Sequence, residues 1–272
     1  MDIYLAGTYS RPFCIEGWYK AMDLYLAGTM YGNQSRAISE LGIAPTGGVS
    51  ILESFYYADE FTEKMIPCFN KFLLDSGAFT FMSAKKSNSI KWDDYVERYA
   101  AFINRNKIDL FFELDIDSIV GISEVERLRR KLERLTGKQS IPVWHKSRGK
   151  DYFLRMCDEY DYVSLGGIVT REFKASEYKY FPWFINTAHS KGAKIHGLGF
   201  TNLKGLKKYH FDSVDSTSWT SGNRFGSVYH FNGRTMIKTD RKPNERMANP
   251  RELAIHNFNE WVKFQKYAEK YL

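Results

Sequence analysis

The sequence predicts a single-domain (β/α)8 barrel of the TIM type, and three observations support this. Short runs of aliphatic, β-branched and aromatic residues recur along the chain, as expected of strands that are buried on both faces of a parallel sheet. Stretches with helical periodicity separate most of these runs. The 272 residues suffice for one such barrel, since the fold commonly takes about 250 residues. An open, doubly wound sheet remains the alternative.

Eight strands are predicted, each a compact apolar run bounded by polar or glycine residues. In chain order they are 23–28, 50–56, 71–77, 110–117, 141–145, 162–166, 194–199 and 211–215. The segment MDLYLAGTM at 22–30 nearly repeats MDIYLAGTY at 1–9. Because either copy has the pattern of a first strand, the sequence leaves open which one lies in the sheet.

Helices are placed by their apolar faces and by residues that favour helix ends. The predicted features are an apolar face from Trp92 to Ile103, a capping box of Ser123 and Glu126, Pro182 and Gly192 at the two ends of one helix, Asn202 as a cap, and Asn249–Pro250 at the start of a long C-terminal helix.

Composition limits the class of protein. The chain is 43% hydrophobic and 16% aromatic, which is typical of a globular domain. It lacks both an apolar run of about 18 residues and the charge order of a secretory signal, so we expect a cytoplasmic protein without a membrane span. The net charge of +7 suits a polyanionic partner. The three cysteines form no C-x-x-C pair, which argues against a disulfide framework or a thiolate zinc site.

Polar residues collect where the predicted strands end, which is where barrel enzymes carry their chemistry. They are Asp75-Ser76-Gly77, Glu113, Asp115 and Asp117, His145-Lys146, Gly166-Gly167, His196 to Gly199, and Asp212 with Asp215. A single aspartate in such a place commonly caps a helix or pairs with an arginine, but several on one rim indicate a site. The glycines have an ordinary explanation as tight turns.

Several chemistries lack their sequence motifs. The chain contains no H-E-x-x-H, no G-x-G-x-x-G, no G-x-x-x-x-G-K-[ST] and no G-x-S-x-G. We therefore expect no metal and no cofactor. A site rich in Asp, Gly and His is suited to acid–base or nucleophilic carboxylate chemistry.

Four motifs in order resemble the guanine transglycosylases. They are DSGAF at 75–79, Gly166-Gly167, Gly197-Leu198-Gly199 and FDSVDS at 211–216. The likeness covers roughly residues 73–226. These enzymes exchange guanine in tRNA for a 7-deazaguanine base. This chain lacks their cysteine–histidine zinc site and any appended RNA-binding domain, and it looks closer to the phage and bacterial branch that inserts 7-deazaguanines into DNA.

The resemblance implies roles for named residues. Asp215 would be the nucleophile that attacks C1′ of the target nucleotide, and Asp75 the general acid and base. The residues implied for base binding are Asp115, Gly166, Gly167, His196, Gly197 and Ser76. Within that set, Asp115 would read the base edge and His196 would pack against the base face. Ala78 replaces the second glycine of the family's D-S-G-G-F motif.

A basic segment follows the implied nucleophile, at about 223–251. The residues expected to contact nucleic acid are Arg224, Arg234, Lys238, Arg241 and Lys242, and the aromatic residues Phe225, Tyr229 and Phe231 interleave with the start of the segment. A solvated basic loop is the ordinary alternative.

Three other functions remain open. The first is the same base exchange on tRNA instead of DNA. The YLAG segments suggest a nucleoside deoxyribosyltransferase, which uses a glutamate on free nucleosides. The barrel would alternatively bind nucleic acid without catalysis, although both implied carboxylates are present.

Overall fold

All eight predicted strands are present in the structure, a computed structural model that describes residues 22–27, 48–77, 80, 90–200, 202–220, 225–242 and 249–272. They are β1 Asp23–Ala27, β2 Ser50–Ser54, β3 Lys71–Asp75, β4 Leu110–Phe111, β5 Val143–Trp144, β6 Tyr162–Leu165, β7 Lys194–Gly197 and β8 Ser213–Ser216. β4 is much shorter than the predicted 110–117, because Glu113 to Asp117 leave the sheet to form side-chain contacts at its rim.

The strands pair in parallel into one curled sheet with the order β4-β3-β2-β1-β8-β7-β6-β5. The two edge strands meet at one isolated parallel bridge, Phe112–Ile141, instead of along a ladder. Beside that bridge the Glu113 amide donates to the Ile141 carbonyl at 3.0 Å. An α/β fold with a curled eight-stranded parallel sheet is thus confirmed, and its strand order is compatible with a TIM-like barrel.

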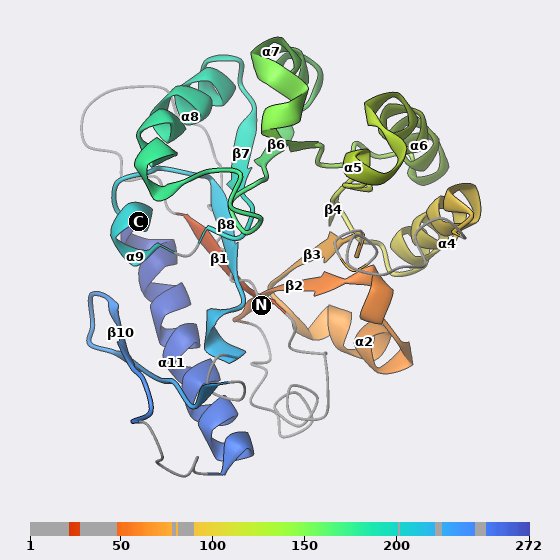
Figure 1. Ribbon diagram of the computed structural model, residues 1–272. Helices are drawn as coiled ribbons and strands as arrows, with labels where there is room; N and C mark the ends of the chain where they lie inside the picture. The colour runs from red at the N-terminus through yellow and green to blue at the C-terminus, as the bar shows by residue number, and fades with distance from the viewer. Residues whose placement is uncertain are drawn as a thin grey trace.

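Helices lie around the outside of the strands (Figure 1). The α-helices of the described residues are α2 Glu60–Met65, α4 Trp92–Arg105, α5 Asp117–Val120, α6 Ile122–Thr136, α7 Gly149–Glu159, α8 Phe181–Ser190, α9 Leu203–Leu206 and α11 Pro250–Tyr271. Short 3-10 helices are η1 Phe55–Tyr57, η2 Ile66–Cys68, η4 Lys146–Arg148, η5 Ala175–Tyr180 and η6 Ser218–Thr220.

Most predicted helix ends are confirmed. α8 begins just before Pro182, α9 is capped by the Asn202 side chain, and α11 is capped by Asn249 with Pro250 at its first position. The capping box of Ser123 and Glu126 is wrong. α6 begins at Ile122, because α5 ends at Gly121, whose φ of 82° starts the next helix earlier than the sequence pattern suggested.

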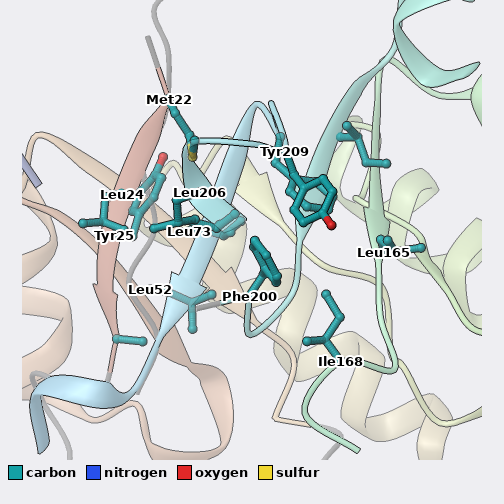
Figure 2. Packing of buried hydrophobic residues seen from close by; sticks show 14 of the residues in the cluster. Met22, Leu24, Tyr25, Leu52, Leu73, Leu165, Ile168, Phe200, Leu206 and Tyr209 are labelled. Atoms are coloured by element: carbon teal, nitrogen blue, oxygen red, sulfur yellow. The ribbon is translucent and has the colours of Figure 1, made fainter. Parts of the chain in front are cut away.

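The core contains β1 from the second of the two similar segments, Asp23–Ala27, and the copy at 1–9 lies outside the described residues. Side chains of β1, β2, β3 and β6 belong to one buried cluster, which also includes Phe200 and Tyr209 (Figure 2). A second cluster fills the space between β3, β4, α4 and α6. Burial of these side chains is the main stabilising contribution to the sheet and its helices.

After β8 the chain forms an antiparallel hairpin, β9 Val228–Phe231 with β10 Met236–Thr239, which packs on α11 (Figure 1). Tyr229 lies against Trp261, with ring centroids 5.2 Å apart. α11 also contacts β1, so it ties the hairpin to the sheet. Within the described part of the chain, no helix combines the length and the apolar character that crossing a membrane requires.

Candidate active site at the carboxyl ends of the strands

The two implied catalytic carboxylates lie on the same face of the sheet. Lys71 of β3 forms an ion pair with Asp23 of β1, and Asp23 is opposite Ser213 of β8 in the register. Side chains alternate along a strand, so Asp75, four residues after Lys71, and Asp215, two after Ser213, project from this shared face.

This face is the concave one. The Tyr162 hydroxyl of β6 reaches the Ser213 hydroxyl of β8 across the intervening β7. The Phe112 ring, next to β4, lies 5.3 Å from the His196 ring of β7. Contacts between strands that are not neighbours require the sheet to curl around these side chains. Asp75 ends β3 and Asp215 is near the end of β8, so both lie toward the carboxyl ends of the strands.

Asp215 is buried, with its residue 2% exposed. His196 Nε2 lies 3.1 Å from its Oδ1, and the Gly199 amide donates to the same oxygen. Gly199 has a φ of 73°, a conformation that glycine adopts without strain and that brings its amide over the carboxylate. Donors directed at a carboxylate stabilise its charged form.

Asp75 is more accessible than Asp215, since it is only partly buried. It accepts a hydrogen bond from the Gly77 amide at 3.0 Å. Ser76 is fully buried, and its carbonyl accepts the Tyr95 hydroxyl at 2.6 Å. A Cβ on Gly77 would lie 2.5 Å from Cβ of Tyr56, so this glycine permits a close approach between chain segments. Ala78 and Phe79 of the same motif lie outside the described residues.

His196 does not have the surroundings expected of a residue that packs against a base. Its residue is 0% exposed. Nδ1 lies 2.6 Å from the Ser213 hydroxyl, and Nε2 faces Asp215. Gly197 is also buried, and a Cβ there would come within 3.2 Å of the Phe211 ring. Both residues therefore lie beneath the surface that a base would touch.

A second group of polar residues, here called the rim cluster, lies after β4, β5 and β6. It comprises Glu113, Asp115, Asp117, His145, Arg148 and Glu172. The sequence placed Glu113, Asp115, Asp117 and His145 at strand ends, with Asp115 implied for base binding, and it gave no indication of Arg148 or Glu172. Neither carries a local signal, because Arg148 lies in the short helix η4 and Glu172 in a loop.

His145 lies between two carboxylates. Nε2 is 2.9 Å from each oxygen of Asp115, and Nδ1 is 3.0 Å from Oε1 of Glu172. Both nitrogens must donate, so the ring is an imidazolium. Burial opposes this charge, but the hydrogen bond and charge of Asp115, with the charges of Glu172 and Asp117, outweigh it and raise the pKa of His145 to about 9.

The paired glycines make room for this histidine. A Cβ on Gly166 would lie 2.8 Å from Cε1 of His145, and one on Gly167 would lie 3.0 Å from the Glu172 side chain. Gly167 also has a φ of 78°. The two glycines predicted to approach a base thus line the back of the His145–Glu172 pair.

Glu113 and Arg148 link the cluster to the interior. Arg148 donates through Nη1 to Glu113 at 2.8 Å and through Nε to Asp117 at 3.1 Å. Arg129 donates to the other oxygen of Glu113 at 3.0 Å. Glu113 is fully buried and also accepts the Val143 amide. It is therefore part of a structural ion-pair network and is not available to a substrate.

Asp212, the other aspartate near β8, also has a structural environment. Its Oδ2 accepts the Ile195 amide at 2.8 Å and lies 2.7 Å from Nε2 of His189. It precedes β8, at the opposite end of the strand from the carboxyl-end rim. Of the two aspartates around β8, Asp215 is the one at that rim.

A cavity of about 750 Å³ adjoins the rim cluster. Its lining includes Asp115, His145, Arg148, Arg155 and Glu172. The side chain of Arg148 is 1% exposed, and its Nη2 makes no hydrogen bond and lies 3.8 Å from Asp115. Its volume is within the range of small-molecule sites, and its lining carries both hydrogen-bond donors and acceptors.

The basic segment is only partly described, since Arg224 lies outside the described residues. Arg234, Arg241 and Lys242 are exposed on or after the hairpin. Lys238 forms an ion pair with Asp240 at 2.7 Å, which partly neutralises it.

The aromatic residues of this segment divide into two kinds. Phe225 is 63% exposed. Tyr229 packs on Trp261, and Phe231 packs on Phe264 and Tyr267. Tyr229 and Phe231 therefore hold the hairpin on α11, whereas Phe225 lies at the surface.

Among the described residues, no group of three His, Cys, Asp or Glu side chains has the arrangement of metal ligands. No protein-family model and no curated protein matches this chain.

Proposed function

We propose that this chain exchanges a base on a nucleic acid, replacing guanine in DNA with a 7-deazaguanine, on a curled sheet that is a variant of the (β/α)8 barrel. One observation carries the proposal. Asp75 and Asp215 project from the same concave face at the carboxyl ends of β3 and β8. Two carboxylates that reach one sugar are the machinery of a retaining double displacement at its C1′.

In the first half-reaction a carboxylate oxygen of Asp215 bonds to C1′ as the bond from C1′ to N9 of guanine breaks. Asp75 enters as the carboxylic acid and gives its proton to the departing base. In the second half-reaction Asp75 takes a proton from the incoming base. That base then bonds to C1′ and releases the Asp215 carboxylate, so the configuration at C1′ is retained.

The rim cavity is the proposed site for the base. Asp115 would accept hydrogen bonds from the donor edge of the base, because each carboxylate oxygen has more than one lone pair. Arg148, whose Nη2 makes no hydrogen bond, supplies a donor for a base carbonyl. The exposed cations of the hairpin, Arg234 and Arg241, would contact phosphates.

The test is incorporation of labelled guanine by the purified protein into duplex DNA, into tRNA, or into free deoxynucleosides. The proposal expects label in DNA, a denaturation-resistant protein–DNA adduct, and loss of both in Asp215→Asn. Asp75→Asn should slow exchange by about 10²- to 10⁴-fold. Label in tRNA alone would replace this function by base exchange on tRNA. Label in free nucleosides, with Asp215→Asn still active, would replace it by a nucleoside deoxyribosyltransferase. Binding of DNA without incorporation would leave a non-catalytic protein.

A further inference from the structure

A chain of hydrogen bonds runs through the concave face and ends at Asp215. The Tyr162 hydroxyl of β6 contacts the Ser213 hydroxyl of β8, and Ser213 lies 2.6 Å from Nδ1 of His196. Nε2 of His196 lies 3.1 Å from Oδ1 of Asp215. The chain thus connects β6, β8 and β7 and leads to Asp215.

Which group donates at each step of this chain follows from the two groups that face the His196 ring, the Asp215 carboxylate and the Ser213 hydroxyl. An ionised carboxylate only accepts, so Nε2 of His196 must carry a hydrogen. Nδ1 faces a hydroxyl, which can donate. The Ser213 hydroxyl then donates to Nδ1 and accepts from Tyr162, and the ring stays neutral while donating to Asp215. The complete burial of the ring beside Phe112 favours this neutral form.

We propose that His196 is a positioning residue for Asp215, held as its Nε2–H tautomer by Ser213 and Tyr162, and that it fixes the orientation of the carboxylate and keeps it ionised. The role of Asp215 in this statement rests on the proposed function, whereas the tautomer of His196 does not. His196 acts from below the site through Asp215 and does not touch the base.

Tyr25 and the Gly199 amide also lie near Asp215, and neither titrates in acid. Tyr25 of β1 is opposite Asp215 in the register. Desolvation by burial, with the charges of Tyr162 and Asp23, holds the pKa of Tyr25 well above its usual value, so it stays neutral in acid. The Gly199 amide donates to Asp215 whatever residue occupies position 196.

The first test is the pH dependence of exchange. His196→Leu removes the donor, and loss of one preorganised donor costs about 10²- to 10³-fold in kcat. KM should change little, and the acidic limb of kcat/KM should move to higher pH, because Asp215 is then harder to ionise. Ser213→Ala should give a smaller change in the same direction. Ser164→Ala is the matched control, since this buried serine contacts the His196 carbonyl and not its ring.

A purely structural histidine would lower stability and leave the acidic limb in place, and that result would overturn the proposal. His196→Gln, which retains a side-chain donor, should recover part of the loss in kcat.

The second test does not require activity. Two-bond ¹H–¹⁵N correlation spectra distinguish the tautomers of an imidazole, and the signal missing in His196→Gln assigns this one among the six histidines. The proposal expects a neutral Nε2–H ring at pH 7 that is perturbed in Ser213→Ala and unaffected in Ser164→Ala. An Nδ1–H ring, or an imidazolium, would overturn it. Failure of the wild-type protein to exchange any base would instead remove the proposed function, and the spectra would still decide the tautomer.

Discussion

His145 and His196 both lie beside an aspartate, and they differ in the group that faces their second nitrogen. For His145 that group is the Glu172 carboxylate, which can only accept, so the ring carries both hydrogens and a positive charge. For His196 it is the Ser213 hydroxyl, which can also donate. Each histidine has an aspartate at Nε2. The comparison teaches that the partner of Nδ1, and not this aspartate, sets the charge of such a histidine.

The two regions also differ in how they are connected to the fold. The rim cluster contains a buried arginine that joins Glu113, Asp117 and the cavity. The chain that leads to Asp215 joins it, through the His196 ring, to the hydroxyls of Ser213 and Tyr162. We therefore expect changes in the rim cluster to affect stability most, and changes in the chain to affect mainly the chemistry of Asp215.

The largest effect is expected for Arg148→Met. The change leaves Asp117 without this partner and Glu113 with only Arg129 and one amide. Removing one partner of a buried ion pair costs about 3–5 kcal/mol. Urea unfolding measures the cost. The control is Arg155→Met, because Arg155 lines the same cavity but is 53% exposed in its pair with Glu126, and such pairs contribute about 0–1 kcal/mol. Equal costs for the two variants would contradict the comparison.

Gly166→Ala should be the next most harmful change. The added Cβ would lie 2.8 Å from atoms of both Val143 and His145, and overpacking of this kind costs about 1–3 kcal/mol. The same unfolding experiment applies. In Gly48→Ala the nearest atom to the new Cβ would be 4.0 Å away, so that variant should unfold like the wild type. A neutral Gly166→Ala would show that the His145 ring is free to move.

The pH dependence of stability sharpens the comparison between the two histidines. The pKa of His145 is raised from 6.5 to about 9 in the folded protein. Its contribution to stability is therefore fully present below pH 6.5 and is lost as the pH rises through 9. Tm measured across this range should fall less in His145→Gln than in the wild type. Exposed His210→Gln is the control. An unchanged slope in His145→Gln would show that His145 is not an imidazolium.

The smallest effect is expected for Ser213→Ala. It removes the hydroxyl that bonds to both Tyr162 and His196, and each such hydrogen bond between neutral groups contributes about 0.5–1.5 kcal/mol. Its urea midpoint should shift slightly, and its stability between pH 6.5 and 9 should keep the wild-type slope. A change of that slope would mean that His196, and not only His145, titrates in this range.

The sequence alone predicted much of the fold, because a buried parallel strand and an amphipathic helix each have a local pattern. The positions of the eight strands, the caps at Asn202 and Asn249, and the order of helices and strands are confirmed. The end of β4 and the start of α6 were not predicted, because tertiary contacts of Glu113 and the turn at Gly121 determine them.

For the candidate site, the sequence determined which polar residues follow the strands, and only the tertiary structure decided which of them meet. Glu113, Asp212 and Asp215 have the same sequence context, an acidic residue beside an apolar run. They differ because Arg148, His189 and His196 come from segments 35, 23 and 19 residues away. The physical reason is that a hydrogen bond needs a specific distance and direction, and these are set by the register and curl of the whole sheet, which no local pattern of residues encodes.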